Sequence, residues 1–145
     1  MEYASVIWDP MYNTDSDKLE CIQRKAARWA LSSYAPRASV DAMLEELQWQ
    51  PLKERRRIQR LAFMYKILNN KVAVPAESVD IVLNTRPVRY TDTNQQKVVT
   101  KRAKNEQFKR SFIIKTIPEW NALSQAVVSA DSEASFKSRL TGQTP

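Results

Sequence analysis

The chain has 145 residues, of which 43% are hydrophobic, so it is long enough to bury one ordinary core or two small ones. It contains no histidine, one cysteine and one glycine, and these counts exclude thiolate-imidazole zinc sites, catalysis by Ser-His-Asp or Cys-His groups, and glycine-rich phosphate loops. Its net charge of +7 is uneven, −3 over residues 1–50 and +10 over residues 51–145, which favours a polyanionic partner, nucleic acid before an anionic membrane.

The same composition narrows the fold class. Tight hairpins and β-bulges draw on glycine for positive φ, so a single glycine disfavours an all-β fold and favours a mainly α one. No apolar run approaches the roughly 20 residues that cross a bilayer, and residues 1–8 lack the basic start of a signal peptide. We therefore expect a soluble, intracellular chain without a membrane segment, with Cys21 as a reduced and buried thiol.

A first helix is predicted over residues 15–34, capped by Asp15 or Asp17. The pair Ala35-Pro36 is expected to end it, because the residue before a proline avoids the helical region. Apolar residues at three- and four-residue steps define the expected buried face: Leu19, Ile22, Ala26, Trp29 and Ala30. Basic residues occupy the opposite face: Lys18, Arg24, Lys25 and Arg28.

Two more helices are predicted before residue 71. The shorter covers residues 39–47, with Ser39 as N-cap and Asp41 in the first turn. The longer covers residues 51–70, with Pro51 in the first turn and Asn69-Asn70 as a left-handed C-terminal cap. The expected buried stripe of the longer helix is Leu52, Ile58, Leu61, Ala62, Tyr65 and Leu68, widened by Phe63, Met64 and Ile67.

The start of this longer helix is strongly basic. Residues 53–60 carry a net charge of +4 beside the positive end of the helix dipole, an arrangement that opposes the usual preference. Two interpretations stay open: an external anion completes the site, or the arginines solubilise an amphipathic helix. The cations are Lys53, Arg55, Arg56, Arg57 and Arg60.

Residues 71–110 lose the apolar periodicity. Residues 91–96 read as a loop, and residues 81–83 and 97–100 as short strands or extended segments. Tyr90 and Phe108 lie among basic residues, a mixture that suits single strands or phosphate backbones, although a plain basic surface loop is an equal alternative. The basic residues are Arg86, Arg89, Lys97, Lys101, Arg102, Lys104, Lys109 and Arg110.

The last third becomes apolar again. Pro118 is expected to start a helical turn that directs Trp120 inward, and Ser132 to precede a final short helix through Leu140. The predicted fold is mainly α: a small helical bundle, an irregular basic segment and short C-terminal helices. We expect a helical thumb-like domain over residues 1–70, a basic linker over residues 71–110 and a helical extension over residues 111–145.

Five sequence blocks, taken in order, resemble the region that follows the palm in jockey-like non-long-terminal-repeat retrotransposon reverse transcriptases. The resemblance covers almost the whole chain. The blocks are residues 2–10 (EYASVIWDP), 19–28 (LECIQRKAAR), 43–68 (MLEELQW, LKERR and MYKIL), 111–123 (SFIIKTIPEWNAL) and 135–140 (SFKSRL).

The resemblance implies the thumb and C-terminal extension of an RNA-directed DNA polymerase, a part that holds nucleic acid while the palm performs the chemistry. The palm's metal-binding Asp-Asp pair does not occur in this sequence. We therefore expect no catalytic site and no cofactor in this chain, with Mg²⁺ required only by the missing palm. The chain is expected to begin at or near the end of the palm, as a truncated element copy or a gene fragment.

The main hypothesis is weakly sequence-specific binding of a primer-template duplex or element RNA through phosphate contacts, in the nucleus or a cytoplasmic ribonucleoprotein. Replacing Arg55, Arg56 and Arg57 by alanine is expected to flatten the salt dependence of binding without unfolding the chain. The expected contact residues are Lys53, Arg55, Arg56, Arg57, Arg60, Lys101, Arg102, Lys104, Lys109 and Arg110.

Two other hypotheses stay open. One is a structural fragment that packs on the missing palm and has no ligand of its own. In that case the tryptophans would contact the palm, whereas a self-contained domain would bury them; they are Trp8, Trp29, Trp49 and Trp120. The weaker hypothesis takes residues 51–70 as a basic amphipathic helix for an anionic membrane or a calmodulin-like partner.

Overall fold

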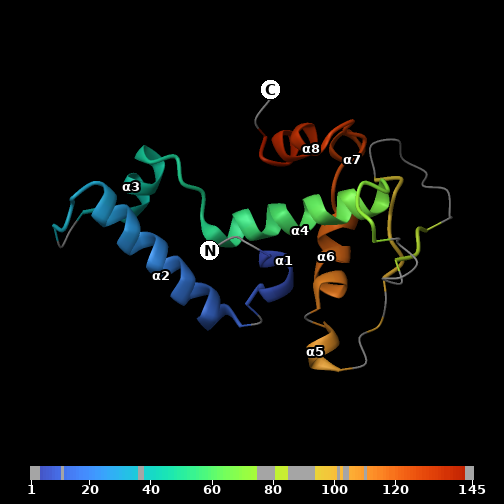
Figure 1. The fold of residues 1–145 in the computed structure, drawn as a ribbon, viewed down its shortest axis with the longest axis horizontal. Coiled ribbons are helices and arrows are strands. Elements are labelled where there is room, and N and C mark those ends of the chain that lie inside the picture. Colours follow the sequence, from blue (N-terminus) through green and yellow to red (C-terminus); the bar gives the residue numbers. More distant parts are fainter. Residues whose placement is uncertain are drawn as a thin grey trace. The chain divides into compact units, whose positions relative to one another are not determined.

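The structure, a computed structural model, describes residues 4–10, 12–35, 38–74, 81–84, 94–100, 102, 105–109 and 111–142. Over these residues the fold is mainly helical and contains no sheet, which confirms the predicted fold class (Figure 1). The chain divides into two compact units, Met1–Arg57 and Ile58–Pro145. This boundary falls inside the long helix, whereas the sequence suggests divisions after residues 70 and 110.

The first unit contains α1 (Ser5–Trp8), α2 (Asn13–Ala30), α3 (Val40–Glu46) and the first turns of α4 (Leu52–Leu68). The predicted bounds of α2 are wrong at both ends. Its N-cap is Tyr12, with no side-chain cap bond, and neither Asp15 nor Asp17 caps it. It ends before the Ala35-Pro36 pair because Ser32 is left-handed, with φ of 50°, and the Ser33 amide donates to the Arg28 carbonyl at 3.0 Å.

The buried face of α2 also differs from the prediction. Ile22 and Trp29, expected inside, are 48% and 75% exposed, and the Cys21 thiol is exposed as well. Ser16, Gln23 and Ala27 are buried instead. Polar side chains face inward because they bond the start of α4: Gln23 Oε1 accepts from the Leu52 amide at 3.2 Å, and Nε2 donates to the Gln50 carbonyl at 2.9 Å.

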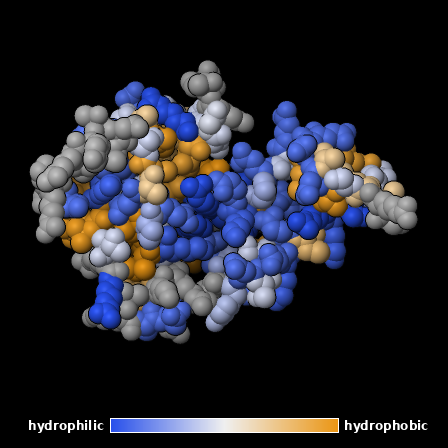
Figure 2. Space-filling view, turned by 180° about the vertical axis from the view of Figure 1, so that it is seen from behind, coloured by the Kyte–Doolittle hydropathy of each residue, from blue (hydrophilic) through white to orange (hydrophobic). Residues whose placement is uncertain are grey.

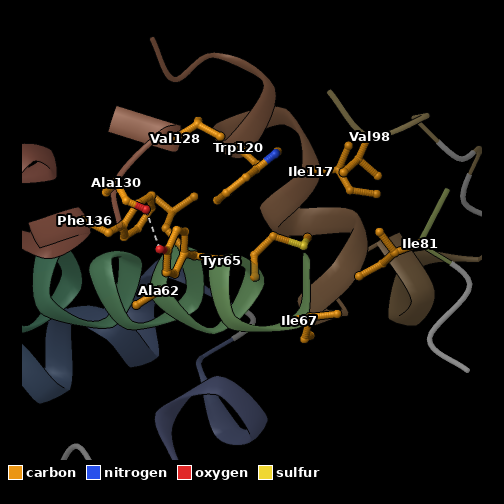
Figure 3. Packing of buried hydrophobic residues seen from close by; sticks show 12 residues of the cluster. Ala62, Tyr65, Ile67, Ile81, Val98, Ile117, Trp120, Val128, Ala130 and Phe136 are labelled. Carbon is orange, nitrogen blue, oxygen red and sulfur yellow. Dashed lines mark hydrogen bonds between the residues drawn. The ribbon is translucent and has the colours of Figure 1, made fainter. Parts of the chain in front are cut away.

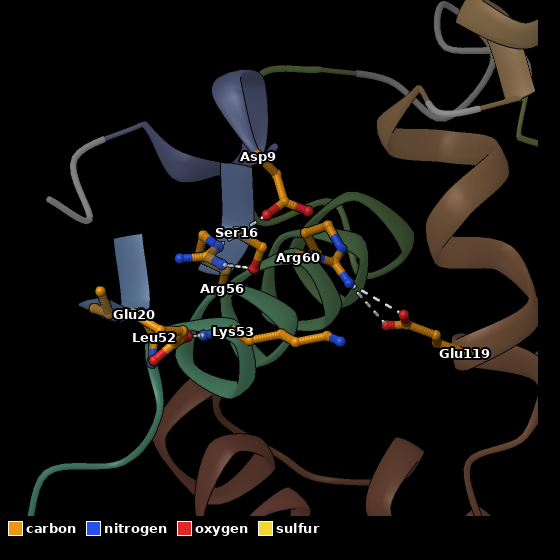
Figure 4. A network of polar contacts seen from close by, with 8 residues as sticks. All are labelled: Asp9, Ser16, Glu20, Leu52, Lys53, Arg56, Arg60 and Glu119. Atoms are coloured by element: carbon orange, nitrogen blue, oxygen red, sulfur yellow. Dashed lines mark hydrogen bonds and ion pairs between the residues drawn. The ribbon is translucent and has the colours of Figure 1, made fainter. Parts of the chain in front are cut away.

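The predicted N-cap of the next helix is confirmed, whereas Pro51, expected in the first turn of the long helix, lies just before it. The Ser39 hydroxyl accepts from the Ala42 amide at 3.4 Å and caps α3. Helix α4 begins one residue after Pro51, and its first amides have an acidic partner: Leu52 and Lys53 donate to the Glu20 carboxylate at 3.2 and 2.6 Å (Figure 4). A carboxylate on α2 thus caps the positive end of α4.

The second unit is built on the rest of α4, whose buried stripe largely matches the prediction. With it lie α5 (Glu106–Lys109), α6 (Phe112–Asn121), α7 (Gln125–Val128) and α8 (Glu133–Leu140). Asn70, with φ of 53°, ends α4 as predicted, and the Lys71 amide donates to the Lys66 carbonyl at 2.8 Å. One apolar cluster fills the unit: Leu61, Ala62, Met64, Tyr65, Ile67, Ile81, Val98, Ile117, Trp120, Val128, Ala130 and Phe136 (Figure 3).

This cluster draws on all three predicted parts of the chain. Figure 3 shows Ile81 and Val98, from the predicted linker, among side chains of α4 and α6. Leu83 and Val98 form an antiparallel bridge, with bonds from the Asn84 amide to the Lys97 carbonyl (2.7 Å) and from the Val99 amide to the Val82 carbonyl (2.8 Å). The prediction of extended segments at residues 81–83 and 97–100 is therefore confirmed.

The C-terminal helices are partly as predicted. Trp120 is fully buried, and Ser132 caps α8 by accepting from the Ser135 amide at 3.1 Å. Pro118, however, lies inside α6 and does not start it. The expected N-terminal position is wrong because the apolar residues from Phe112 onward already pack as a helix, so α6 forms although Pro118 removes one of its backbone hydrogen bonds.

A pair of ion pairs at the start of α8 makes the fold less stable at acid pH. Glu133 pairs with Lys66 and Lys137, both at 2.7 Å. Burial alone would raise the pKa of Glu133, but hydrogen bonds and charges of the two lysines outweigh it and hold the pKa below its ordinary value of 4.5. The ionised carboxylate therefore stabilises the fold above its unfolded pKa, and this contribution is lost as pH falls through the lower folded pKa.

From pH 7 to pH 3, Glu133→Gln should lose less free energy of unfolding than the unsubstituted chain. The difference should be below about 1 kcal/mol, because the three side chains are partly exposed. Urea unfolding at both pH values measures this difference. Glu106→Gln, a carboxylate in the first turn of α5, is the control. An acid sensitivity of Glu133→Gln equal to that of the unsubstituted chain would contradict the expectation.

Candidate nucleic-acid interface

Arg56, one of the predicted contact residues, is paired with side chains inside the protein. Its side chain is 2% exposed; Nε donates to Asp9 Oδ1 at 3.0 Å and Nη2 to Ser16 Oγ at 2.8 Å (Figure 4). Both partners lie in the first unit, before and within α2. A guanidinium held this way has no surface to offer a phosphate, and its removal would leave a nearly buried carboxylate without this hydrogen-bonded cation.

Arg60 has a comparable role in the second unit. Its side chain is 6% exposed, and Nη2 donates to both carboxylate oxygens of Glu119, at 3.0 and 3.2 Å. Glu119 lies on α6, so the ion pair joins two helices of the same core. The burial of Arg56 and Arg60 argues against phosphate contacts by either residue, and we remove both from the candidate interface.

Three basic residues remain on this part of α4. Lys53 is exposed, whereas Arg55 and Arg57 are half-buried. Arg57 Nη1 donates to Glu54 at 2.6 Å, a partly exposed pair that a phosphate can replace at little cost. Lys53 and Arg57 stand four residues apart and share one face of the helix, while Arg55 points to another side. We call Lys53, Arg55 and Arg57 the α4 cations.

The protein's own carboxylates answer the positive charge at the start of α4. Glu20 already binds the first amides of α4, and Asp9 neutralises Arg56. Carboxylates of the chain itself therefore supply the negative charge that the basic helix start requires. What continues to favour an anionic ligand is the net charge of +10 over residues 51–145.

The basic segment after the bridge is only partly described. Arg102 is exposed, Phe108 is 41% exposed and Lys97 is half-buried. Lys109 belongs to α5, but its side chain lies outside the described part of the structure. Also outside it lie the other basic residues and the tyrosine predicted here: Arg86, Arg89, Tyr90, Lys101, Lys104 and Arg110.

A set of amide side chains fixes the start of this segment. Asn94 is fully buried; Nδ2 donates to the Trp120 carbonyl at 2.8 Å, and Oδ1 accepts from the Gln96 amide at 2.8 Å. Trp120 Nε1 donates in turn to the Gln96 carbonyl at 2.9 Å. Asn121 holds both backbone groups of Val98, accepting from its amide at 2.8 Å and donating to its carbonyl at 2.9 Å.

We call Asn94, Trp120 and Asn121 the amide bracket. It joins residues 94–98 to the end of α6 and so sets where Lys97 lies. Beside it is an open pocket of about 370 Å³, lined by Asn84, Lys97, Val98, Val99, Thr100 and Asn121. Sequence reasoning missed Asn94, because a buried asparagine in a polar stretch looks like any other loop residue.

The described part of the chain holds no group of three or more Cys, Asp or Glu residues arranged to bind a metal ion. Nor does any helix described there combine the length and apolar character that a membrane crossing requires. Comparison of the chain with protein-family models, with curated proteins and with solved structures finds no match. The resemblance to retrotransposon reverse transcriptases therefore stays a prediction from the sequence blocks.

Proposed function

We propose that the chain is a non-catalytic portion of a retrotransposon RNA-directed DNA polymerase that binds primer-template or element RNA through phosphate contacts. The five ordered sequence blocks support the enzyme family. The observation that carries the binding is the net charge of +10 over residues 51–145, with Lys53 and Arg102 exposed to solvent. On this proposal the chain acts in the nucleus or in a cytoplasmic ribonucleoprotein.

The binding mechanism is electrostatic. Lysine and arginine side chains neutralise phosphates and release condensed counterions, so affinity falls with salt and depends little on sequence. The α4 cations and Arg102 are the described contacts; Lys101, Lys104, Lys109 and Arg110 complete the proposed set. The sequence has no adjacent aspartates to hold paired Mg²⁺ ions, so catalysis belongs to residues outside this chain.

The test is the combined variant Lys53→Ala, Arg55→Ala and Arg57→Ala. Arg56 is left out, because its burial makes the triple substitution of residues 55–57 a destabilising one. For an RNA-DNA duplex, the slope of log affinity against log salt should become shallower by about 0.9 for each phosphate that the variant no longer neutralises. Fluorescence anisotropy between about 50 and 200 mM salt measures the slope.

The matched control removes an exposed cation elsewhere. Arg139→Gln on α8 lowers the net charge without touching α4, and its slope should stay close to that of the unsubstituted chain. An unchanged slope in the triple variant, with its circular dichroism spectrum intact, would remove α4 from the interface. Shallower slopes in both proteins would show a response to overall charge only.

A second candidate function is packing against another domain of a parent polymerase. The tryptophans favour it in part: Trp120 is fully buried in the second unit, but Trp8 and Trp29 are 39% and 75% exposed. On this hypothesis the first unit presents apolar surface that a partner domain covers. A chain that binds no RNA or duplex at low salt and self-associates through the first unit would support it.

A further inference from the structure

The second half of α2 presents large side chains to solvent. Ile22 is 48% exposed and Trp29, seven residues later on the same face, is 75% exposed. Tyr34, just beyond the helix, is 65% exposed. Figure 2, coloured by hydropathy and without residue labels, shows hydrophobic residues at the surface in several places on the molecule. An indole with most of its surface in water is a ready stacking partner, because its faces have not been covered by packing.

Along the chain, the charged residues nearest to Trp29 are all basic. Residues 21–34 contain Arg24, Lys25 and Arg28 and no acidic residue. Arg24 and Lys25 are exposed. Lys25, expected on the opposite face of the helix, stands three residues after Ile22 and four before Trp29 and therefore shares their face. Among the described residues, none of these three cationic side chains makes a hydrogen bond or ion pair.

The first half of α2 provides a contrast within the same helix. Two of its three acids are engaged: Asp15 accepts from Lys18 at 2.9 Å, and this pair raises the pKa of Lys18. Glu20 caps α4. Tyr12, 58% exposed at the helix start, stands within five residues of Asp15 and Asp17. The two ends of α2 thus offer similarly exposed rings in opposite electrostatic surroundings.

We propose that the second half of α2, with Tyr34, binds single-stranded nucleic acid. A base stacks on the Trp29 indole, Tyr34 offers a second ring, and Arg24 and Lys25 bind the flanking phosphates. This pattern favours a polyanion over a protein because a cation, Lys25, stands between the two apolar side chains of this face, and Arg24 adds a second exposed cation one residue earlier. The inference goes beyond the proposed function: it adds a second site, on a different element, for a strand with unpaired bases.

The test uses the full chain and a labelled oligothymidylate. Trp29→Ala should weaken binding about tenfold, within the range for loss of one stacked base, and Trp29→Phe should weaken it less. Tyr12→Ala, the exposed ring at the acidic end, is the matched control and should leave the affinity unchanged. Arg24→Ala combined with Lys25→Ala should make the salt slope shallower by about 0.7 for each phosphate left without its cation.

The outcomes separate this site from the α4 cations. If Trp29→Ala binds oligothymidylate as tightly as the unsubstituted chain, the α2 site is refuted, whatever the α4 variant does with duplex. If Trp29→Ala weakens single-strand binding while the α4 variant leaves the duplex slope unchanged, the α2 site stands and the α4 interface fails. Self-association abolished by Trp29→Ala, without any oligonucleotide binding, would identify the face as a protein contact and overturn the inference.

Discussion

Trp120→Ala should lower the free energy of unfolding of the second unit by about 3–5 kcal/mol. The indole is fully buried and stacks on Phe136, with ring centroids 5.9 Å apart. Its removal leaves a cavity among α4, α6 and α8, and it also deprives the Gln96 carbonyl of its bond from Nε1. Chemical denaturation followed by circular dichroism measures the loss.

The control for this variant is the same substitution at an exposed site. Trp29→Ala removes an equally large side chain that is 75% exposed, so it should change the free energy of unfolding by less than about 0.5 kcal/mol. Comparable losses in the two variants would mean that Trp120 does not anchor the core. A large loss for Trp120 alone would support the role of its indole as the centre of the second unit's core.

Arg56→Ala should destabilise the first unit by about 3–5 kcal/mol, because it leaves the nearly buried Asp9 carboxylate without its cation. The Ser16 hydroxyl loses its donor as well. Arg55→Ala, one residue away and half-buried, is the control and should cost much less. Urea unfolding of both variants provides the comparison.

A double substitution separates the ion pair from simple loss of packing. Asp9→Asn removes the negative charge, so the combination of Asp9→Asn with Arg56→Ala should cost clearly less than the sum of the two single changes. Strict additivity would show that Arg56 and Asp9 do not interact. Such a result would mean that the burial of Arg56 has another cause than its pair with Asp9.

Local patterns predict the parts of the fold that depend on neighbouring residues. The Ser39 cap, most of the buried stripe of α4 and its end at Asn70 follow from spacing and capping preferences, and these are confirmed. Each of these features involves residues within about one helical turn of one another. Sequence reasoning is strongest at that range.

The errors share a different cause. The sequence places Arg56 and Arg60 at the surface, but their partners lie 47 and 59 residues away along the chain. The predicted inward face of α2 is wrong for the same reason, since Gln23 is buried by its bonds to residues 50 and 52. Apolar periodicity assigns the buried face of a helix from its hydrophobic residues alone. It gives no sign of polar partners that lie far away in the sequence.

The candidate interface is predictable only in outline. Charge counting identifies residues 51–145 as the basic part of the chain, and Lys53 and Arg102 are indeed exposed. It cannot separate these cations from the buried arginines beside them. The exposed Trp29 escapes prediction because an apolar residue at helical spacing is expected to face the core.

The bond pattern at Val98 has a consequence for solubility. Two short extended segments paired side by side normally leave unpaired amides and carbonyls along their outer edges, where strands of other molecules can add. Here the Asn121 amide occupies both groups of Val98 on the side away from Leu83. One side chain thereby takes the place of a neighbouring strand and blocks edge-to-edge aggregation at that residue.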